Sequence, residues 1–237
     1  MVLGIMTTIA SNLQAVRAAM MSAAVAAGRP AGDIGLLAVS KTFPADAIRE
    51  AYQAGQTCFA ENYVQEALEK IAVLHELPIE WHYIGPIQSN KTRPIAENFA
   101  WVHSVDRLKI AERLSAQRPE HLPPLQICLQ VNISGEVSKS GVPPDDVCGL
   151  ALDIAVLPNL RLRGLMAVPA PSEDVVIQRF YFAQLRELRD QLNRQGLQLD
   201  TLSMGMSHDF AAAIAEGATM VRIGTAIFGT RHYGDKQ

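Results

Sequence analysis

Eight short apolar segments recur along the chain with helix-like stretches between them, and this alternation limits the fold more than any other feature. Short runs rich in apolar and β-branched residues are typical of buried strands. The strand candidates cover residues 36–40, 58–60, 81–85, 101–105, 125–133, 160–168, 201–204 and 220–223. Strands that alternate with helices imply a parallel sheet, because each crossover helix returns the chain to the same end.

The helix-like stretches are long enough to serve as these crossovers. They include residues 45–54, 63–74, 107–117 and 175–193, and another helix at 7–27 precedes the first strand. Eight such units in 237 residues fit one (β/α)8 TIM barrel with an extra N-terminal helix. We therefore predict a single domain over residues 1–237, with a doubly wound open sheet as the alternative.

Composition and charge exclude several kinds of partner. The formal net charge is −3 and the sequence pI is about 6.1, so neither nucleic acid nor an anionic membrane is an expected partner. The three cysteines, Cys58, Cys128 and Cys148, have no metal-ligand spacing and no even count, which indicates a reducing compartment. The first 28 residues lack the pattern of a membrane helix or signal peptide. We expect a cytoplasmic protein.

Lys41 is placed where a lysine can carry chemistry. It follows the apolar run Leu36-Leu37-Ala38-Val39, so it lies where a buried strand opens into a loop. Burial lowers the pKa of an ammonium group, and a neutral amine forms an imine with a carbonyl compound. Lys41 is therefore the candidate imine-forming residue.

The last two strand candidates run into segments suited to a phosphate group. Ser203, Gly205 and Ser207 follow the seventh strand, and Gly224 and Thr225 follow the eighth. TIM barrels often bind phosphate there, because glycines expose backbone N–H groups and hydroxyls add donors. Two ordinary interpretations stay open: Gly224 as a strand-to-helix turn, and Ser207 as the N-cap of a helix beginning near residue 209.

Strand alternation predicts which side chains face the barrel interior. In the fifth strand, the polar residues share one face and the apolar residues share the other; the polar set is Gln126, Cys128, Gln130 and Asn132. The same period of two turns Arg222 into the barrel mouth and places Lys41 in register with Val39. A one-residue change of parity would reverse these orientations.

An imine-forming amine and a phosphate site on neighbouring strands fit pyridoxal 5′-phosphate (PLP), whose aldehyde and phosphate project from one ring. The chain also resembles the pyridoxal phosphate homeostasis proteins, whose barrel is related to the N-terminal domain of alanine racemase. The resemblance runs from the first helix to Arg231. It is carried by AVSKTFP at 38–44, AENYVQE at 60–66, WHYIGPIQSNK at 81–91, VNISGEVSKSG at 131–141, LRLRGLMAVPAP at 160–171, SMGMSHDF at 203–210 and VRIGTAIFGTR at 221–231.

The resemblance implies a role for each residue of the site. Lys41 forms the covalent aldimine with PLP, and Arg222 approaches the pyridine nitrogen. The phosphate is held by Ser207, Gly224 and Thr225, with Ser203 and Met204 nearby, while Asn62 and His82 line the surroundings of the ring. The other interpretation of His82 is a hydrogen-bonded histidine of the barrel interior with no catalytic role. Ala60 departs from the family's usual glycine, and its methyl group could shift the loop that carries Asn62.

Lys139 is the other lysine to consider for the imine. It follows the fifth strand, where it can instead steer the phosphate or close over the mouth. Lys70, Lys91 and Lys109 lie on helix-like segments and are expected to be solvated, and Trp81 and Trp101 are expected to be packing residues.

Three functions are compatible with this site. The first is a PLP-binding protein of vitamin B6 and amino-acid homeostasis, without established catalysis, that passes the cofactor to apoenzymes. A charged guanidinium beside the pyridine nitrogen weakens the ring as an electron sink, which disfavours amino-acid turnover. The chain ends shortly after the eighth strand, so we expect that the C-terminal β domain of the fold-type III racemases is missing. We also expect a monomer. The alternatives are a small racemase or lyase that uses Lys41 as base, and a lysine-imine aldolase for sugar phosphates.

Overall fold

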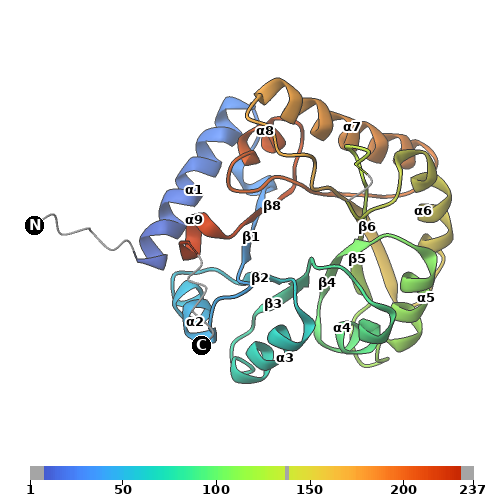
Figure 1. The fold of residues 1–237 in the computed structure, drawn as a ribbon, viewed down its shortest axis with the longest axis horizontal. Coiled ribbons are helices and arrows are strands. Elements are labelled where there is room, and N and C mark those ends of the chain that lie inside the picture. Colours follow the sequence, from blue (N-terminus) through green and yellow to red (C-terminus); the bar gives the residue numbers. More distant parts are fainter. Residues whose placement is uncertain (1–7, 137–138, 231–237) are drawn as a thin grey trace, which may run out of the picture.

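Eight parallel strands form a closed barrel in the computed structural model, which describes residues 8–136 and 139–230 (Figure 1). The strands are β1 (Gly35–Val39), β2 (Cys58–Glu61), β3 (Glu80–Tyr83), β4 (Trp101–Val105), β5 (Leu125–Gln130), β6 (Leu160–Met166), β7 (Thr201–Ser203) and β8 (Met220–Ile223). The barrel closes because β1 pairs in parallel with β8, from Gly35 opposite Met220 to Ala38 opposite Ile223. The predicted TIM barrel is confirmed, and the open-sheet alternative is wrong.

Helices surround the barrel as a ring outside the strands (Figure 1). They are α1 (Ile9–Ala26), α2 (Ala45–Gln53), α3 (Val64–Val73), α4 (Thr92–Asn98), α5 (Leu108–Gln117), α6 (Val147–Ala155), α7 (Val175–Arg194), α8 (Phe210–Ala215) and α9 (Thr225–Phe228). None of these helices, within the described part of the chain, has the length and apolar content needed to cross a membrane.

The leading helix α1 completes the ring where α9 is too short to do so. It contacts α2, α8 and α9, and in Figure 1 it lies beside the last helices of the chain. Its buried face is Leu13, Val16, Met20 and Ala24, a spacing of three and four residues. The side chain of Thr8 caps its N-terminus by accepting a hydrogen bond from Ser11 N. The predicted helix began at Thr7, which lies outside the described residues.

The core has an outer layer between strands and helices and an inner layer within the barrel. Along β5, Ile127 and Leu129 pack in the outer layer, whereas Cys128 packs inside with Trp101 and Met166. The predicted alternation along the fifth strand is therefore confirmed. The strand ends at Gln130 rather than residue 133, because Val131 instead forms an isolated bridge with Val142.

Candidate functional site

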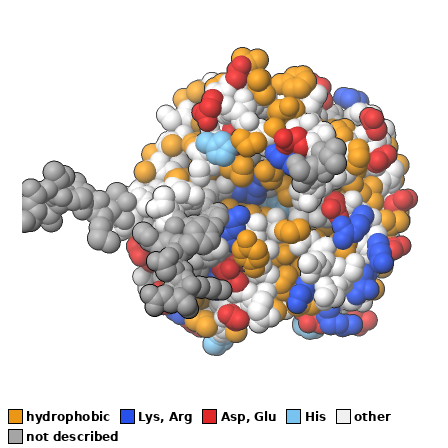
Figure 2. All heavy atoms as spheres, viewed as in Figure 1, with side chains coloured by type: hydrophobic (Ala, Val, Ile, Leu, Met, Phe, Trp, Pro, Cys, Tyr) orange, Lys and Arg blue, Asp and Glu red, His pale blue; other side chains and the backbone are white. Residues whose placement is uncertain are grey.

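A cavity of about 350 Å³ opens at the carboxyl ends of the strands. Figure 2 shows this side of the molecule hollowed near its centre, where basic side chains are visible. Six residues predicted from the sequence line the cavity: Lys41, Asn62, Ser207, Arg222, Gly224 and Thr225. They come from loops after β1, β2 and β7 and from the end of β8. Barrel closure is what brings these distant segments together.

The backbone around Lys41 is held from both sides. Ser40 N donates to the carbonyl of Ala60 at 3.0 Å, which continues the β1–β2 pairing up to Lys41. Thr42 has a positive φ of 69°, a conformation that costs energy for a β-branched residue, and its N–H donates to Glu66 Oε1 at 2.6 Å. These contacts fix the loop so that the Lys41 side chain enters the cavity.

Lys70 lies beneath this loop in a buried ion pair with Glu61. Its Nζ donates to Glu61 Oε1 at 2.8 Å and to the backbone carbonyl of Ser40 at 2.9 Å. The Ser40 hydroxyl also donates to Glu61 at 2.6 Å. The prediction that Lys70 is solvated is wrong, because its amphipathic helix turns it toward the barrel; Lys91 and Lys109 are exposed as expected. The ion pair ties together the residues that precede Lys41 and Asn62.

Asn62 is held by two residues of the β3 segment. The Tyr83 hydroxyl donates to the carbonyl of Asn62 at 3.1 Å, and burial raises the pKa of this hydroxyl to about 12. Gly85 packs directly against the Asn62 backbone. The side-chain Oδ1 of Asn62 is buried and has no hydrogen-bond partner among the described residues. A buried acceptor without a partner at a cavity wall suits a bound ligand that donates to it.

Replacing Gly85 with alanine should destabilise the protein by about 1–3 kcal/mol. A Cβ atom there would lie 2.1 Å from the Asn62 carbonyl oxygen, so the backbone on one side must move. Denaturant unfolding measures the loss. The matched control is Gly149→Ala on α6, where a Cβ meets nothing within 4 Å and the change should be neutral or stabilising by up to about 1 kcal/mol. Equal losses in both variants would contradict the tight contact at Gly85.

Arg222 is immobilised at the floor of the cavity. Its Nη1 donates to the backbone carbonyl of Ser203 at 2.5 Å and to Ser203 Oγ at 2.8 Å, and its Nη2 donates to the carbonyl of Ala167 at 2.9 Å. The side chain is buried, as the strand register predicted. Burial lowers the pKa of the guanidinium to about 10, so the group remains charged at neutral pH.

A hydrogen-bonded chain continues from Arg222 through the barrel interior. Ser203 Oγ lies 2.8 Å from His103 Nδ1, and His103 Nε2 lies 2.9 Å from His82 Nδ1. His82 Nε2 then lies 2.9 Å from the carboxylate of Glu80 at the other end of the barrel. Burial lowers the pKa of both histidines and so favours their neutral form, in which each ring has one donor and one acceptor.

Three of the predicted residues do not line the cavity. His82 and Ser203 belong to the buried chain, one layer below it. Met204 is fully buried in the outer core between strands and helices. His82 and Ser203 are therefore connected to the cavity through the hydrogen bonds that lead to Arg222. Met204 is a packing residue.

The phosphate end of the predicted site is formed by Ser207, Gly224 and Thr225. Asp209, not Ser207, is the N-cap residue of α8, so the capping interpretation of Ser207 is wrong. Gly224 precedes α9, as the turn interpretation required, and a Cβ there would lie 3.2 Å from the carbonyl oxygen of Val39. The two hydroxyls and the glycine thus border one side of the cavity.

Sequence reasoning missed the apolar walls of the cavity and one polar residue. The additional lining residues are Val39, Phe43, Ile84, Met166, Val168, Met206 and His208. It also missed His103, although Trp101 and His103 share a strand face and the same alternation would have placed both inside.

Neither Lys139 nor Ala60 lines the cavity. The Nζ of Lys139 donates to the carbonyl of Val168 at 3.3 Å and pairs with Glu136 at 3.0 Å. The Ala60 side chain is fully buried with Leu37 and Val39 inside the barrel, so its methyl group is accommodated beneath the loop.

The donor set fits a phosphorylated aldehyde. The Arg222 guanidinium supplies positive charge, the Lys41 amine can form an imine, the hydroxyls of Ser207 and Thr225 line the cavity, and Asn62 offers a buried acceptor. The volume and the apolar walls are those of a small-ligand site. When bound here, PLP would supply an aldehyde for Lys41 and an electron-accepting ring.

Comparisons with known proteins identify relatives of this chain. The family model for the alanine racemase N-terminal domain matches residues 7–232. The pyridoxal phosphate homeostasis protein of Pseudomonas aeruginosa is 64% identical over 229 residues, which cover 97% of this chain and 98% of the relative. The protein with the same description from Escherichia coli K12 is 53% identical over 234 residues, with coverage of 98% and 100%.

A solved structure extends the similarity to three dimensions. PipY of Synechococcus elongatus, determined with PLP bound, superposes with a TM-score of 0.83 at 40% identity. The match covers 94% of this chain and 100% of PipY. The similarity therefore extends over nearly the whole chain.

Proposed function

We propose that Lys41 holds pyridoxal 5′-phosphate as a covalent aldimine, since this chain belongs to the family of pyridoxal phosphate homeostasis proteins with an alanine racemase N-terminal domain. The single observation that carries the proposal is that one cavity is lined by the Lys41 amine, the Arg222 guanidinium and the hydroxyl residues Ser207 and Thr225. The amine binds the aldehyde, and the hydroxyls with the backbone near Gly224 bind the phosphate.

Arg222 determines what the bound ring can do. Three hydrogen bonds to Ser203 and Ala167 fix the guanidinium in place, and its charge disfavours a proton on a pyridine nitrogen placed beside it. Such a ring is a weak electron sink. This arrangement supports storage and release of the cofactor over amino-acid turnover.

The proposed biological role is PLP and amino-acid homeostasis within the cell. A reversible imine keeps a reactive aldehyde bound until an acceptor takes it, so the proposed partners are PLP-requiring apoenzymes. We further propose a single-domain monomer in the cytoplasm. Light scattering of the purified protein tests the oligomeric state directly.

The phosphate contacts can be tested by equilibrium binding. We expect Ser207→Ala and Thr225→Val each to weaken PLP binding, because a hydrogen bond to a charged group is worth about 1.5–3 kcal/mol, or a tenfold or greater change in Kd. Absorbance titration of the purified protein measures Kd. Pyridoxal, which lacks the phosphate, is the control ligand, and its affinity should be unchanged. Equal losses for both ligands would contradict the assignment.

A small racemase or lyase is the second candidate, and one observation favours it. The His208 imidazole lines the same cavity as Lys41, so a second proton-transfer group is available there. Incubation of the PLP-loaded protein with individual amino acids, followed by chiral chromatography, separates the two candidates. Turnover that disappears with Lys41→Ala and with His208→Gln would support the enzyme.

A further inference from the structure

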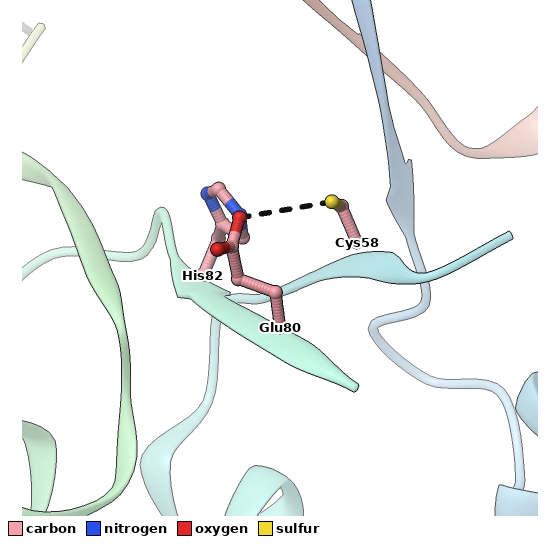
Figure 3. A group of neighbouring side chains, drawn as sticks. All are labelled: Cys58, Glu80 and His82. Carbon is pink, nitrogen blue, oxygen red and sulfur yellow. Dashed lines mark hydrogen bonds and ion pairs between the residues drawn. The ribbon is translucent and has the colours of Figure 1, made fainter. Parts of the chain in front are cut away.

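A second cluster of reactive side chains lies at the end of the barrel opposite the cavity. Cys58, Glu80 and His82 point toward one another from β2 and β3 (Figure 3). The strand register explains why they meet. Cys58 pairs directly with Glu80, and His82 lies two residues further along the same face of β3. The sequence spacing of the cysteines gave no sign of this cluster, because the contacts run across strands.

The distances within the cluster are short enough for a shared ion. Glu80 Oε1 lies 2.9 Å from His82 Nε2 and 3.7 Å from Cys58 Sγ. One donor atom from each residue lies within 4.8 Å of the other two. Thiolate sulfur, imidazole nitrogen and carboxylate oxygen form a donor set that Zn²⁺ uses in proteins, with bond lengths of about 2.0–2.3 Å. The donors must move closer together to reach these bond lengths, and the two side chains that would move, Cys58 and Glu80, are both only partly buried.

His82 is held in the orientation that a metal ligand needs. Its ring is fully buried, and its Nδ1 contacts His103 Nε2 at 2.9 Å, which leaves Nε2 directed at the cluster. Such contacts from the second ring nitrogen orient most metal-binding histidines. A metal on Nε2 requires the ring proton on Nδ1, and the chain permits this. His103 can then donate to Ser203 Oγ, which accepts from Arg222 as well.

Solvent can reach the cluster, and nearby charge does not prevent a cation from binding. The Glu80 side chain is 48% exposed, and it borders a surface hollow with Trp101 and Arg163. The Arg163 guanidinium is the nearby cation, but it forms hydrogen bonds of 2.7–3.2 Å with the carboxylate of Asp200. A water molecule from the solvent side can complete the coordination.

We propose that Cys58, Glu80 and His82 form a binding site for a divalent transition metal of the Zn²⁺ class. The Cys58 thiol gives its proton to solvent when the sulfur binds the ion. The ion joins β2 to β3 at the end of the barrel opposite the cavity. Hydrogen bonds connect it to the cavity floor through His82, His103, Ser203 and Arg222. The site is independent of the proposed PLP function.

Cobalt(II) titration of untagged, chelator-treated protein without PLP tests this site. Wild type should bind one equivalent and develop the sulfur-to-cobalt charge-transfer absorbance that a thiolate ligand produces, and Zn²⁺ should displace it. Cys58→Ser should remove this band, and Glu80→Gln should weaken binding by at least about 10- to 100-fold, the loss seen even for outer-shell changes. Cys148→Ser is the control, because Cys148 is a half-buried thiol beside Gln195, away from the cluster.

Each outcome of the titration decides the proposal. A one-equivalent band that survives in Cys148→Ser and disappears in Cys58→Ser supports it. A missing band in wild type, or a band that persists in Cys58→Ser, overturns it. Circular dichroism of each variant verifies that the barrel is folded. Since PLP is absent throughout, failure here leaves the cofactor proposal unaffected.

Discussion

Replacing Lys41 with alanine is expected to eliminate the imine absorbance of the PLP-loaded protein. The other cavity groups bind the phosphate and contact the ring, but within the described part of the cavity lining no second lysine is available. Loss of the covalent bond should also weaken retention of PLP by at least about tenfold, or 1.4 kcal/mol. Absorbance spectra before and after gel filtration measure both effects.

Lys139→Ala is the matched control for this experiment. Lys139 lies in the loop after β5 and does not line the cavity, although its Nζ donates to the backbone carbonyl of the lining residue Val168 and pairs with Glu136. We expect this variant to keep the imine absorbance of wild type. An imine that survives in Lys41→Ala and disappears in Lys139→Ala would transfer the assignment to Lys139.

Replacing Lys70 with methionine should cost about 3–5 kcal/mol of unfolding free energy, the typical penalty for breaking a buried ion pair. Both partners are buried, with side-chain exposures of 7% for Lys70 and 0% for Glu61. Burial already raises the pKa of Glu61, and Lys70 opposes that shift. Without Lys70, the carboxylate loses the cation that lowers its pKa and the Ser40 carbonyl loses its donor. Denaturant unfolding measures the change.

Two further variants show whether the ion pair causes this loss. Lys109→Met changes an exposed lysine on α5 and should alter stability by no more than about 0.5 kcal/mol. The double variant Glu61→Gln/Lys70→Met removes both charges of the fully buried pair and leaves only Glu66, whose side chain is 30% exposed, without its lysine. It should therefore recover a large part of the stability. A double variant no more stable than Lys70→Met alone would contradict this explanation. Weaker imine formation in Lys70→Met would show that the pair positions Lys41.

Much of the fold could be predicted because strand alternation is a local signal. Arg222 lies between Val221 and Ile223, so its direction follows from the two apolar neighbours that pack against helices. The cavity residues near β1 and β8 could be located because barrel closure makes those strands neighbours. The resemblance to a known family added the roles of the individual residues.

Features that depend on contacts between distant segments could not be predicted. The burial of Lys70 requires a carboxylate on β2 and a backbone carbonyl after β1 at the same place. The cluster of Cys58, Glu80 and His82 depends on the register between β2 and β3. Strand alternation predicts whether a side chain points into the barrel, but it does not predict how far from the mouth that side chain lies. The positions of His82 and Ser203 below the cavity therefore could not be predicted.

Reduction of the PLP-loaded wild-type protein with borohydride, followed by proteolysis and mass spectrometry, tests the central claim most directly. Borohydride converts an imine to a stable secondary amine and so marks the lysine that formed it. We predict the added mass of reduced PLP on the peptide that contains Lys41. The same mass on the Lys139 peptide, or on no lysine peptide, would contradict the account.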